Sequence, residues 1–470
     1  MTQVGTETNP LRVAIIGAGP SGFYVAEHLL KQDVLAVEID LFDRLPTPYG
    51  LVRGGVAPDH QKIKSVTKVY DRTALDPRVR FYGGVSFGEH LTLADFETLY
   101  HQVVFTTGAQ TDRRMGIPGE DLLGSYPATA FVAWYNGHPD FRDLEFDFSH
   151  ACAAVVGVGN VAVDVARILC RTTEELAKTD IADYALEALS QSKIKKVYML
   201  GRRGPMQAAF TNPELKELGE LEGADLYVPP DEAELDAFSR QALETGTDRA
   251  AARKVEMIQN YAKRLSGDKR RQLIMRFLVS PVELRGNESG HVISMRLVKN
   301  ELYATDAGTL RPRATDVHED LPVGLVFRSV GYQGVPLPEI PFDDRWGVIL
   351  NQAGRILDAE TSQHRVGLYT AGWIKRGPTG VIGTNKPDAL ETVNCMLDDA
   401  AAGAMLRPEC PKPEDAASYI LQRQPQYVSF GDWQRLDAME VERGKALGRP
   451  RLKFTRIEDM LEAIRKATVS

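Results

Sequence analysis

Two glycine-rich segments have the residue spacing of a turn that binds phosphate groups. The first contains Gly17, Gly19 and Gly22 in a G-x-G-x-x-G pattern, between a short apolar run and a helical pattern. The first two glycines permit a tight turn whose N–H groups can approach a pyrophosphate, and the third lets the helix pack closely on the strand. Because glycine-rich turns are common, the pattern is informative mainly through its position between a strand and a helix.

An acidic residue supports a dinucleotide at this first turn. A second apolar run, residues 37–42, ends at Asp43. At that position of a strand–turn–helix–strand unit, a carboxylate can accept hydrogen bonds from the hydroxyls of an adenosine ribose. The alternative is that Asp43 is an exposed turn residue, but the complete unit favours the ribose role.

The second segment repeats this arrangement 140 residues further along the chain. It has Gly157 and Gly159 at the first two positions and Ala162 at the third. A strand expected over residues 197–200 completes the unit. The repeat predicts a second dinucleotide-binding unit.

Two arginines follow that strand, where the first unit has its acid. Arg202 and Arg203 could pair with the 2′-phosphate of NADP, whereas an NAD site would have a carboxylate there. A solvated basic turn is the alternative interpretation. One site with an acid and one with two arginines predicts two different dinucleotides, FAD and NADP(H).

Two sheets must carry these two turns. Each unit opens as strand, glycine turn and helix, which is the beginning of a parallel β-α-β unit. Three further apolar runs end close to a glycine, at residues 100–109, 323–331 and 366–372. A chain that leaves one sheet, builds a second and returns would have this order. We therefore expect an α/β fold with two Rossmann-like dinucleotide-binding domains, the NADP domain being inserted into the FAD domain.

The expected domain boundaries follow from these strands. Residues 1–109 and 332–470 would form a discontinuous FAD-binding domain, with residues 405–470 as a C-terminal helical extension. Residues 110–331 would form the NADP-binding domain, in which the polar stretch 231–271 has a helical pattern.

Composition and charge exclude several classes of protein. The 470 residues, 43% hydrophobic and 26% charged, are typical of a globular chain of two or three domains. A net charge of −8 argues against a general affinity for nucleic acid. The apolar stretches are too interrupted to span a membrane, and the first twelve residues lack the features of a signal or transit peptide. A cytoplasmic location is expected.

The four cysteines argue against thiol and metal chemistry. They are widely scattered, and none forms a C-x-x-C pair. A disulfide framework, a zinc ribbon and a redox dithiol are therefore not expected, and the sequence indicates no metal site.

Five blocks of sequence also carry a family resemblance. They are G-A-G-P-S-G-F-Y at 17–24, L-P-T-P-Y-G-L-V-R-G-G-V-A-P-D-H at 45–60, G-N-V-A-V-D-V-A-R-I-L at 159–169, G-R-R-G-P-M-Q-A-A-F-T at 201–211 and A-G-W-I-K-R-G-P-T-G-V-I at 371–382. The chain resembles the adrenodoxin-reductase-like NADPH–ferredoxin reductases, most closely the bacterial soluble members. The likeness runs in family order from residue 11 to near the C-terminus, and the absence of a mitochondrial presequence fits a bacterial cytoplasm.

The resemblance implies contacts for both cofactors. Besides Gly17, Gly19 and Gly22, it implies FAD contacts from Ser21, Asp43, Leu51, Phe87, Trp373, Gly380, Val381 and Ile382. It implies NADP contacts from Arg113 (or its neighbour Arg114), Gly159, Asn160, Val161, Arg202, Arg203 and Glu214, with Gly380 near both cofactors. Trp373 could equally be a packing residue.

Two residues are implied on the nicotinamide side of the site. His60 precedes an expected helix, where a histidine is usually solvated, and its alternative role is proton supply or polar positioning. Glu214 lies in the first turn of an expected helix, where a carboxylate is favourable in any case. Its catalytic role rests on the resemblance.

The activity implied is that of a ferredoxin–NADP(+) reductase, a flavoprotein oxidoreductase. It would transfer a hydride from NADPH to FAD and then single electrons to a ferredoxin. An acidic iron–sulfur partner would need a positive docking surface. Residues Arg249–Arg271 contain eight basic and two acidic residues, a net charge of +6, and are a candidate for it. A solvated helix surface is the alternative.

The sequence argues against two other classes of flavoprotein and leaves two alternatives. A flavin disulfide reductase would need a redox C-x-x-C pair, and a glutamate-synthase-type subunit would need cysteine clusters for iron–sulfur centres; the sequence has neither. A flavin monooxygenase and a dinucleotide-sensing protein without turnover stay open.

Overall fold

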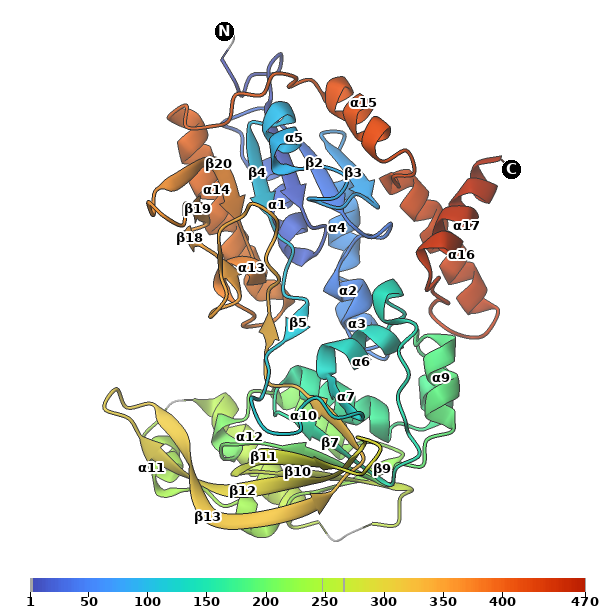
Figure 1. Cartoon of the computed structure of the whole chain (residues 1–470), viewed down its shortest axis with the longest axis vertical. Coiled ribbons are helices and arrows are strands. Elements are labelled where there is room, and N and C mark those ends of the chain that lie inside the picture. The colour runs from blue at the N-terminus through green and yellow to red at the C-terminus, as the bar shows by residue number, and fades with distance from the viewer. Residues whose placement is uncertain (1–2, 247, 265–266, 470) are drawn as a thin grey trace.

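Two sheets, one above the other in Figure 1, form the centres of two bodies of the molecule. The first body surrounds a seven-stranded sheet and the second a six-stranded sheet. The structure is a computed structural model that describes residues 3–246, 248–264 and 267–469. The predicted ranges 231–271, 1–109 and 332–470 also include residues 247, 265–266, 1–2 and 470, which lie outside the described residues.

The seven-stranded sheet is built around β1, whose six residues are all buried. A nearly continuous apolar strand is what a parallel sheet covered on both faces requires. The strand order is β18-β19-β20-β4-β1-β2-β3, so the chain returns to this sheet after building the other one. The strands are β1 (Leu11–Ile16), β2 (Val37–Asp43), β3 (Val79–Gly83), β4 (Gln102–Phe105), β18 (Asn351–Gln352), β19 (Arg355–Leu357) and β20 (His364–Thr370).

Helices cover this first sheet. Helix α1 packs along α14, and both lie against the central strands. The helices of this body are α1 (Pro20–Lys31), α2 (Leu51–Gly54), α3 (Gln61–Lys64), α4 (Thr67–Ala74), α5 (Leu93–Leu99), α13 (Trp373–Arg376), η4 (Ile382–Thr384) and α14 (Asn385–Ala401).

The six-stranded sheet has the order β6-β14-β7-β8-β10-β9 and is parallel throughout. Its strands are β6 (Ser125–Pro127), β7 (Cys152–Val156), β8 (Lys196–Leu200), β9 (Ala224–Tyr227), β10 (Arg271–Arg276) and β14 (Leu325–Arg328). Its helices are α6 (Ala128–Tyr135), η1 (Pro139–Phe141), α7 (Asn160–Cys170), α8 (Thr173–Leu176), α9 (Asp183–Ser190), η2 (Pro205–Gln207), α10 (Asn212–Gly219), η3 (Pro230–Glu232), α11 (Ala237–Thr245) and α12 (Arg249–Ala262). The predicted α/β fold with two Rossmann-like sheets is confirmed.

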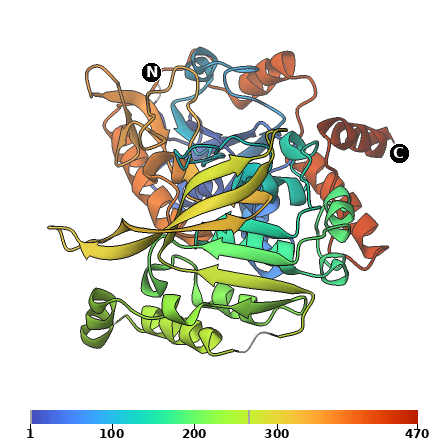
Figure 2. The same ribbon diagram turned by 60° about the horizontal axis from the view of Figure 1, so that its bottom comes forward.

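A three-stranded antiparallel sheet lies against the second body and was not predicted. It consists of β11 (Val279–Gly286), β12 (Val292–Ala304) and β13 (Leu310–Pro322), the yellow strands in the foreground of Figure 2. One face packs on the six-stranded sheet, where Met295 and Leu297 meet Val156. Because β13 is largely exposed, its polar sequence gives no apolar run from which a strand could be predicted.

Short strands connect the two bodies. β5 (Thr111–Asp112) pairs with β15 (Tyr332–Gln333), one strand leaving the first body and the other returning to it. The hairpin β16 (Phe342–Asp343) and β17 (Val348–Ile349) follows. The predicted domain boundaries fall beside β5 and β15, and their exact positions stay a prediction.

The last part of the chain is helical. It contains α15 (Pro413–Arg423), α16 (Phe430–Lys445) and α17 (Ile457–Val469). Helix α16 begins with a capping box in which Ser429 and Asp432 satisfy each other's backbone N–H groups. Within the described part of the chain, no helix is both long and apolar enough to cross a membrane.

Candidate functional site

The first glycine turn joins β1 to α1 at the carboxyl edge of the first sheet. Gly17 has a φ of +111°, and a Cβ on Gly22 would lie 2.1 Å from the Gly17 carbonyl oxygen. Both glycines are therefore required by the protein's own backbone. Gly19 differs, because a Cβ added there would have the Gly50 Cα, 3.9 Å away, as its nearest neighbour. The turn is open at Gly19, at the N-terminus of α1, where a pyrophosphate can be bound.

Asp43 supports this turn directly. One carboxylate oxygen accepts the Ala18 N–H at 3.0 Å, and the other accepts the Leu45 N–H at 3.0 Å. Burial raises the pKa of the Asp43 carboxyl, against these hydrogen bonds and Arg44, which lower it. Each oxygen retains a lone pair for a ribose hydroxyl. Asp43 thus holds the turn, and its ribose contact stays a prediction.

Several predicted FAD residues lie around the same turn. The Tyr49 N–H donates to the Ala18 carbonyl at 2.7 Å, which brings Leu51, at the start of α2, beside the turn. A Cβ on Gly372 would be 2.0 Å from the Ser21 hydroxyl, so the segment 371–382 contacts the start of α1.

Other predicted FAD residues lie near the carboxyl ends of β4 and β20. Phe87 packs on Phe105 at a ring distance of 5.1 Å. Trp373 begins α13 and packs on Tyr332 of the connecting strand β15 at 5.3 Å. In the same segment Gly380 has a φ of +79°, Val381 is 53% exposed, and Ile382 begins η4.

The second glycine turn joins β7 to α7. Gly157 has a φ of +139°, and a Cβ there would be 2.2 Å from the Ser329 carbonyl oxygen. Ala162 replaces the third glycine and is fully buried. A Cβ on Gly159, by contrast, would meet nothing within 4 Å. The two turns therefore have the same form. A Cβ at the first glycine would clash with protein backbone, whereas the space beside the second glycine is free.

The neighbours of this opening are fixed in place. The Asn160 side-chain oxygen accepts the Thr211 N–H at 3.0 Å, which ties the start of α7 to the chain entering α10. Val161 follows in the first turn of α7 and is half-buried.

Arg202 and Arg203 follow β8 at the edge of this second turn. Their carbonyl oxygens accept the Asn300 side-chain amide at 3.0 Å and the Leu278 N–H at 3.2 Å, so the backbone is fixed. Burial and the neighbouring Arg202 lower the pKa of Arg203. Among the described residues, neither guanidinium forms an ion pair with a carboxylate. Two adjacent arginines without a carboxylate partner have the charge to bind an anion, and their contact with the 2′-phosphate stays a prediction.

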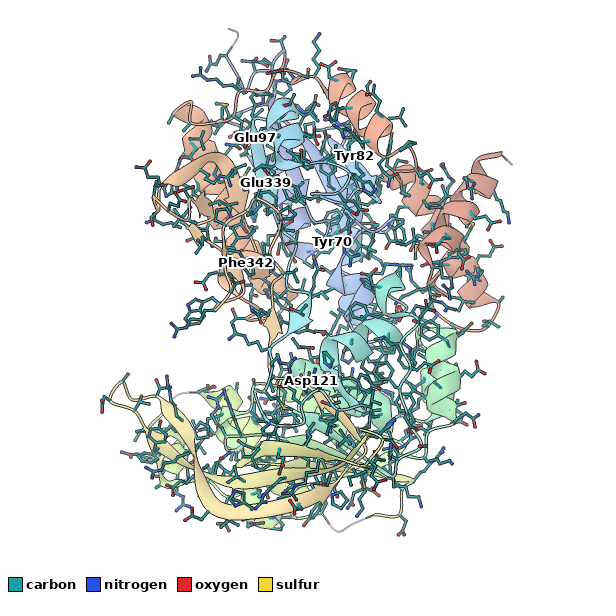
Figure 3. The ribbon with its side chains drawn as sticks, in the orientation of Figure 1. Tyr70, Tyr82, Glu97, Asp121, Glu339 and Phe342 are labelled. Carbon is teal, nitrogen blue, oxygen red and sulfur yellow. The ribbon has the colours of Figure 1, made fainter. Side chains whose placement is uncertain are left out.

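The neighbouring residues Arg113 and Arg114 have different partners. Arg114 pairs with Asp121, which Figure 3 labels on the side of the second body that faces the first. Arg113 instead donates to the Trp346 carbonyl oxygen at 3.3 Å. Its guanidinium has no carboxylate partner within the described part of the chain.

A polar junction lies where the two bodies meet. The His60 Nε2 is 2.9 Å from the Glu217 carboxylate, and the His60 Nδ1 faces the Arg167 guanidinium at 3.4 Å. Arg167 is fully buried and also binds Asp59 at 2.8 Å and Glu214 at 3.2 Å. Because an arginine can only donate, in a neutral imidazole Nδ1 would accept from Arg167 and the Nε2–H would donate to Glu217.

Glu217 is a residue that sequence reasoning missed. Glu214 and Glu217 lie three residues apart on one face of α10, where the sequence offers two equivalent carboxylates. The fold directs Glu217 to His60 and Glu214 to Arg167. The E-L-K-E spacing was the available signal, but only the tertiary packing decides between the two.

In the junction a single buried guanidinium, that of Arg167, is shared by the carboxylates of Asp59, Asp164, Glu214 and Glu217. Burial alone would raise the pKa of Asp59, but Arg167 and Arg171 hold it well below its usual range. Burial and Asp164 raise the pKa of Glu214. His60, Glu214 and Glu217 have ligand atoms within 4.8 Å of one another, but the Arg167 guanidinium already supplies the positive charge that a cation would bring.

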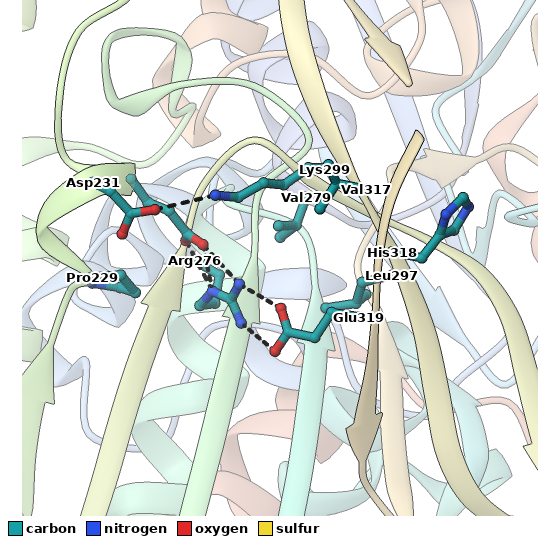
Figure 4. A pocket seen from close by; sticks show the side chains of 10 residues that line it. Pro229, Asp231, Arg276, Val279, Leu297, Lys299, Val317, His318 and Glu319 are labelled. Atoms are coloured by element: carbon teal, nitrogen blue, oxygen red, sulfur yellow. Dashed lines mark hydrogen bonds and ion pairs between the residues drawn. The ribbon is translucent and has the colours of Figure 1, made fainter. Parts of the chain in front are cut away.

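A cavity of about 320 Å³ lies elsewhere, between the second body and the β11–β13 sheet. Figure 4 shows Arg276 paired with Glu319, and Lys299 paired with Asp231. Because these cations are already neutralised, the cavity lacks the uncompensated charge that distinguishes the second glycine turn.

The cysteines come from separate elements and are all free: Cys152, Cys170, Cys395 and Cys410. Burial raises the pKa of Cys170 to about 12, which leaves it an inert thiol.

We expect that replacing each cysteine singly with serine leaves NADPH oxidation and FAD content unchanged apart from small packing losses. Selective loss of turnover in any serine variant that still binds FAD would reveal a redox thiol.

Two open glycine turns on two sheets, one with an acid and one with unpaired arginines, define a flavoprotein oxidoreductase that uses FAD and NADP. A family profile described as "Pyridine nucleotide-disulphide oxidoreductase" matches residues 11–200. The chain is 46% identical over 464 residues to NADPH-ferredoxin reductase FprA of Mycobacterium tuberculosis, covering 96% of this chain and 98% of the relative. It is 40% identical over 471 residues to human mitochondrial NADPH:adrenodoxin oxidoreductase, covering 98% and 93%.

A solved structure agrees with these relatives. Mycobacterium tuberculosis FprA in complex with NADPH matches with a TM-score of 0.90 and 44% identity, covering 97% of this chain and 100% of that one. The chain belongs to the family of NADPH–ferredoxin reductases that includes FprA and adrenodoxin oxidoreductase, and the predicted family is confirmed.

Proposed function

We propose that the protein is a ferredoxin–NADP(+) reductase that passes electrons from NADPH through FAD to a ferredoxin. The observation that carries this proposal is the pair of open glycine turns, at Gly19 and Gly159, in a chain of this family. FAD, when bound, supplies the hydride-accepting and one-electron-donating chemistry. Residues 1–109 and 332–470 would bind FAD, and residues 110–331 would bind NADP.

The FAD site would use the first turn and the segment around Trp373. We assign the pyrophosphate to Gly17, Gly19 and Gly22, and the ribose to Asp43. FAD would also be bound by Ser21, Leu51, Phe87, Trp373, Gly380, Val381 and Ile382. Exposure of Val381 and the open turn at Gly19 support this assignment.

The NADP site would use the second turn. Gly159, Asn160 and Val161 would face the pyrophosphate, and Arg202 and Arg203 the 2′-phosphate. Arg113 is assigned in preference to Arg114, because Arg114 is already paired with Asp121. Glu214 and Gly380 would lie at the nicotinamide end.

His60 would hold a proton at Nε2, oriented by Glu217. With Nδ1 facing Arg167, a proton exchanged with the site would move through Nε2. Glu214 acts through Arg167 in this arrangement, as a positioning residue. The bacterial cytoplasmic location stays a prediction from the sequence resemblance.

Anaerobic addition of NADPH to the purified protein tests the function. The yellow flavin absorbance is expected to bleach within the mixing time of seconds and to return when a ferredoxin is added. A flavin that stays oxidised under NADPH would indicate a dinucleotide-sensing protein. Bleaching followed by turnover with oxygen and an organic substrate, but not with ferredoxin, would indicate a monooxygenase.

The ferredoxin would dock on exposed basic residues of the segment Arg249–Arg271. Not all of its charges are available, because Arg271 is buried and donates to the Ile194 and Arg171 carbonyl oxygens at 3.1 and 2.8 Å. Lys254 is likewise bound to the Ala208 carbonyl. Arg264 and Lys269 are exposed but donate to the Gly219 and Leu221 carbonyl oxygens. Among the described residues, the exposed charges without such a bond are those of Arg249, Arg253, Lys263 and Arg270.

Replacing Arg249 and Arg253 with glutamate is expected to raise the KM for an acidic ferredoxin roughly tenfold, because exposed charges steer association. The effect should shrink above ~0.15 M salt, where the screening length is about 8 Å. Flavin bleaching by NADPH should not change. As a control, the same charge reversal at the exposed Arg311 and Arg313 of β13 should leave the ferredoxin KM unaltered. A reaction that does not depend on salt would contradict an acidic partner.

A further inference from the structure

The two bodies are joined a second time by the C-terminal clasp, residues 440–456, which comprise the end of α16 and the chain before α17. On the side of the first body, the buried Glu440 binds Arg53 of α2 through two hydrogen bonds of 2.6 and 2.8 Å. The Lys453 ammonium donates to the Arg53 carbonyl oxygen at 3.2 Å. The clasp is therefore fixed to the helices that follow the first glycine unit.

The same clasp is fixed to the second body. Arg449 is buried, donates to the Thr179 carbonyl oxygen at 2.9 Å, and also binds the Ile181 carbonyl oxygen and the Asp183 carboxylate. Lys453 donates to the Asn136 carbonyl oxygen at 3.0 Å. One stretch of chain thus satisfies buried groups of both bodies.

Asp180 connects the clasp with the helix that begins after His60. Its carboxylate binds the Lys64 ammonium of α3 at 2.7 Å and lies 3.7 Å from Lys453. Burial alone would raise the pKa of Asp180, but Lys453 and Lys64 hold it at about 2. Because His60 is the residue immediately before α3, this contact positions the polar junction as well.

These contacts oppose relative movement of the bodies. Interfaces between domains of one chain are usually mobile unless they are large or strongly held. Moving the second body away would break the hydrogen bonds and ion pairs that Arg449, Lys453 and Asp180 form across the contact. The connecting pair β5 and β15 is only two residues long on each side and can act as a hinge. The polar junction, where Asp59 binds Arg167 and His60 meets Glu217, is a further contact between the bodies.

We propose that the C-terminal clasp holds the two bodies at the angle required for hydride transfer, with Arg449 and Lys453 as positioning residues. The proposal rests on the proposed reductase function. Hydride transfer requires the donor and acceptor rings to lie about 3–3.5 Å apart, and small misplacements cost large factors in rate. FAD would be bound by the first body alone, and the pyrophosphate and 2′-phosphate of NADP by the second body alone, so these contacts do not depend on the angle.

The test compares Arg449→Ala with the unaltered holoenzyme by anaerobic stopped flow. In Arg449→Ala the rate of flavin bleaching at saturating NADPH is expected to fall about tenfold or more. FAD content, the dissociation constant for NADPH and ferricyanide reoxidation of dithionite-reduced enzyme should not change. Arg449→Lys, which retains the charge, should restore part of the rate. Arg435→Ala, an exposed change on helix α16 outside the clasp, is the matched control and should bleach normally.

An unaltered bleaching rate in Arg449→Ala would overturn the proposal, as would weaker NADPH binding with an unaltered rate. If Arg449→Ala does not retain FAD, Asp183→Ala removes the exposed carboxylate partner instead, and a normal bleaching rate in that variant would overturn the proposal. The unaltered enzyme separates the two hypotheses, because failure of NADPH to bleach it would contradict the proposed function itself.

Discussion

Replacing Arg202 and Arg203 together with alanine is expected to remove most of the preference for NADPH over NADH. The two arginines are adjacent residues just after β8, and within the described residues neither forms an ion pair with a carboxylate. Hydrogen bonds between charged groups contribute ~1.5–3 kcal/mol each, so two of them would discriminate by roughly 100- to 10,000-fold. The loss should appear as a fall in kcat/KM for NADPH, with kcat/KM for NADH nearly unchanged.

Steady-state kinetics with both nucleotides and a small acceptor such as ferricyanide measure this change. The single variants should each lose part of the discrimination, Arg203→Ala more than Arg202→Ala, because Arg203 is the less solvated of the two. Arg313→Ala, an exposed arginine of β13 already paired with Glu301, is the control and should retain the full preference. Equal kcat/KM for NADPH and NADH in the unaltered enzyme would refute the assignment of Arg202 and Arg203 to the 2′-phosphate.

The parts of the site that were predictable from sequence are those with local signatures. A positive φ at Gly17 and Gly157 and the close packing at Gly22 are requirements of the backbone itself, so residue type and spacing reveal them. The same holds for Arg202 and Arg203, whose position follows from the order of strand and turn. In each case the signal lies within about forty residues of chain.

The parts that were not predictable depend on contacts between distant segments. Glu217 reaches His60 across 157 residues of sequence, and nothing local distinguishes it from Glu214. The clasp brings Glu440 to Arg53 across 387 residues. The strand β13 is too exposed to have an apolar pattern. The sequence predicted Arg271 to be part of a basic docking surface, but the residue is buried. It begins strand β10, where its guanidinium donates to the Ile194 and Arg171 carbonyl oxygens.

Gly159→Ala is expected to give a folded protein that contains FAD but binds NADPH and NADH equally poorly. Gly159 has an extended backbone conformation that alanine adopts without strain, and a Cβ there would meet no protein atom within 4 Å. The methyl group would instead occupy the space through which the pyrophosphate approaches the backbone N–H groups. We expect kcat/KM to fall roughly 10- to 100-fold for both nucleotides, since an obstruction of about 1 Å displaces the reacting ring.

Gly157→Ala distinguishes this effect from damage to the fold. Its φ of +139° and the Ser329 carbonyl oxygen 2.2 Å from the new Cβ make the substitution costly to the protein itself, by ~1–3 kcal/mol from the backbone alone. The midpoint temperature of thermal unfolding should therefore be lower in Gly157→Ala and unchanged in Gly159→Ala. Loss of NADPH binding but not NADH binding in Gly159→Ala would place the 2′-phosphate, rather than the pyrophosphate, at this turn. Normal kinetics with both nucleotides would mean that NADP binds elsewhere, because no bound pyrophosphate could share that space with a methyl group.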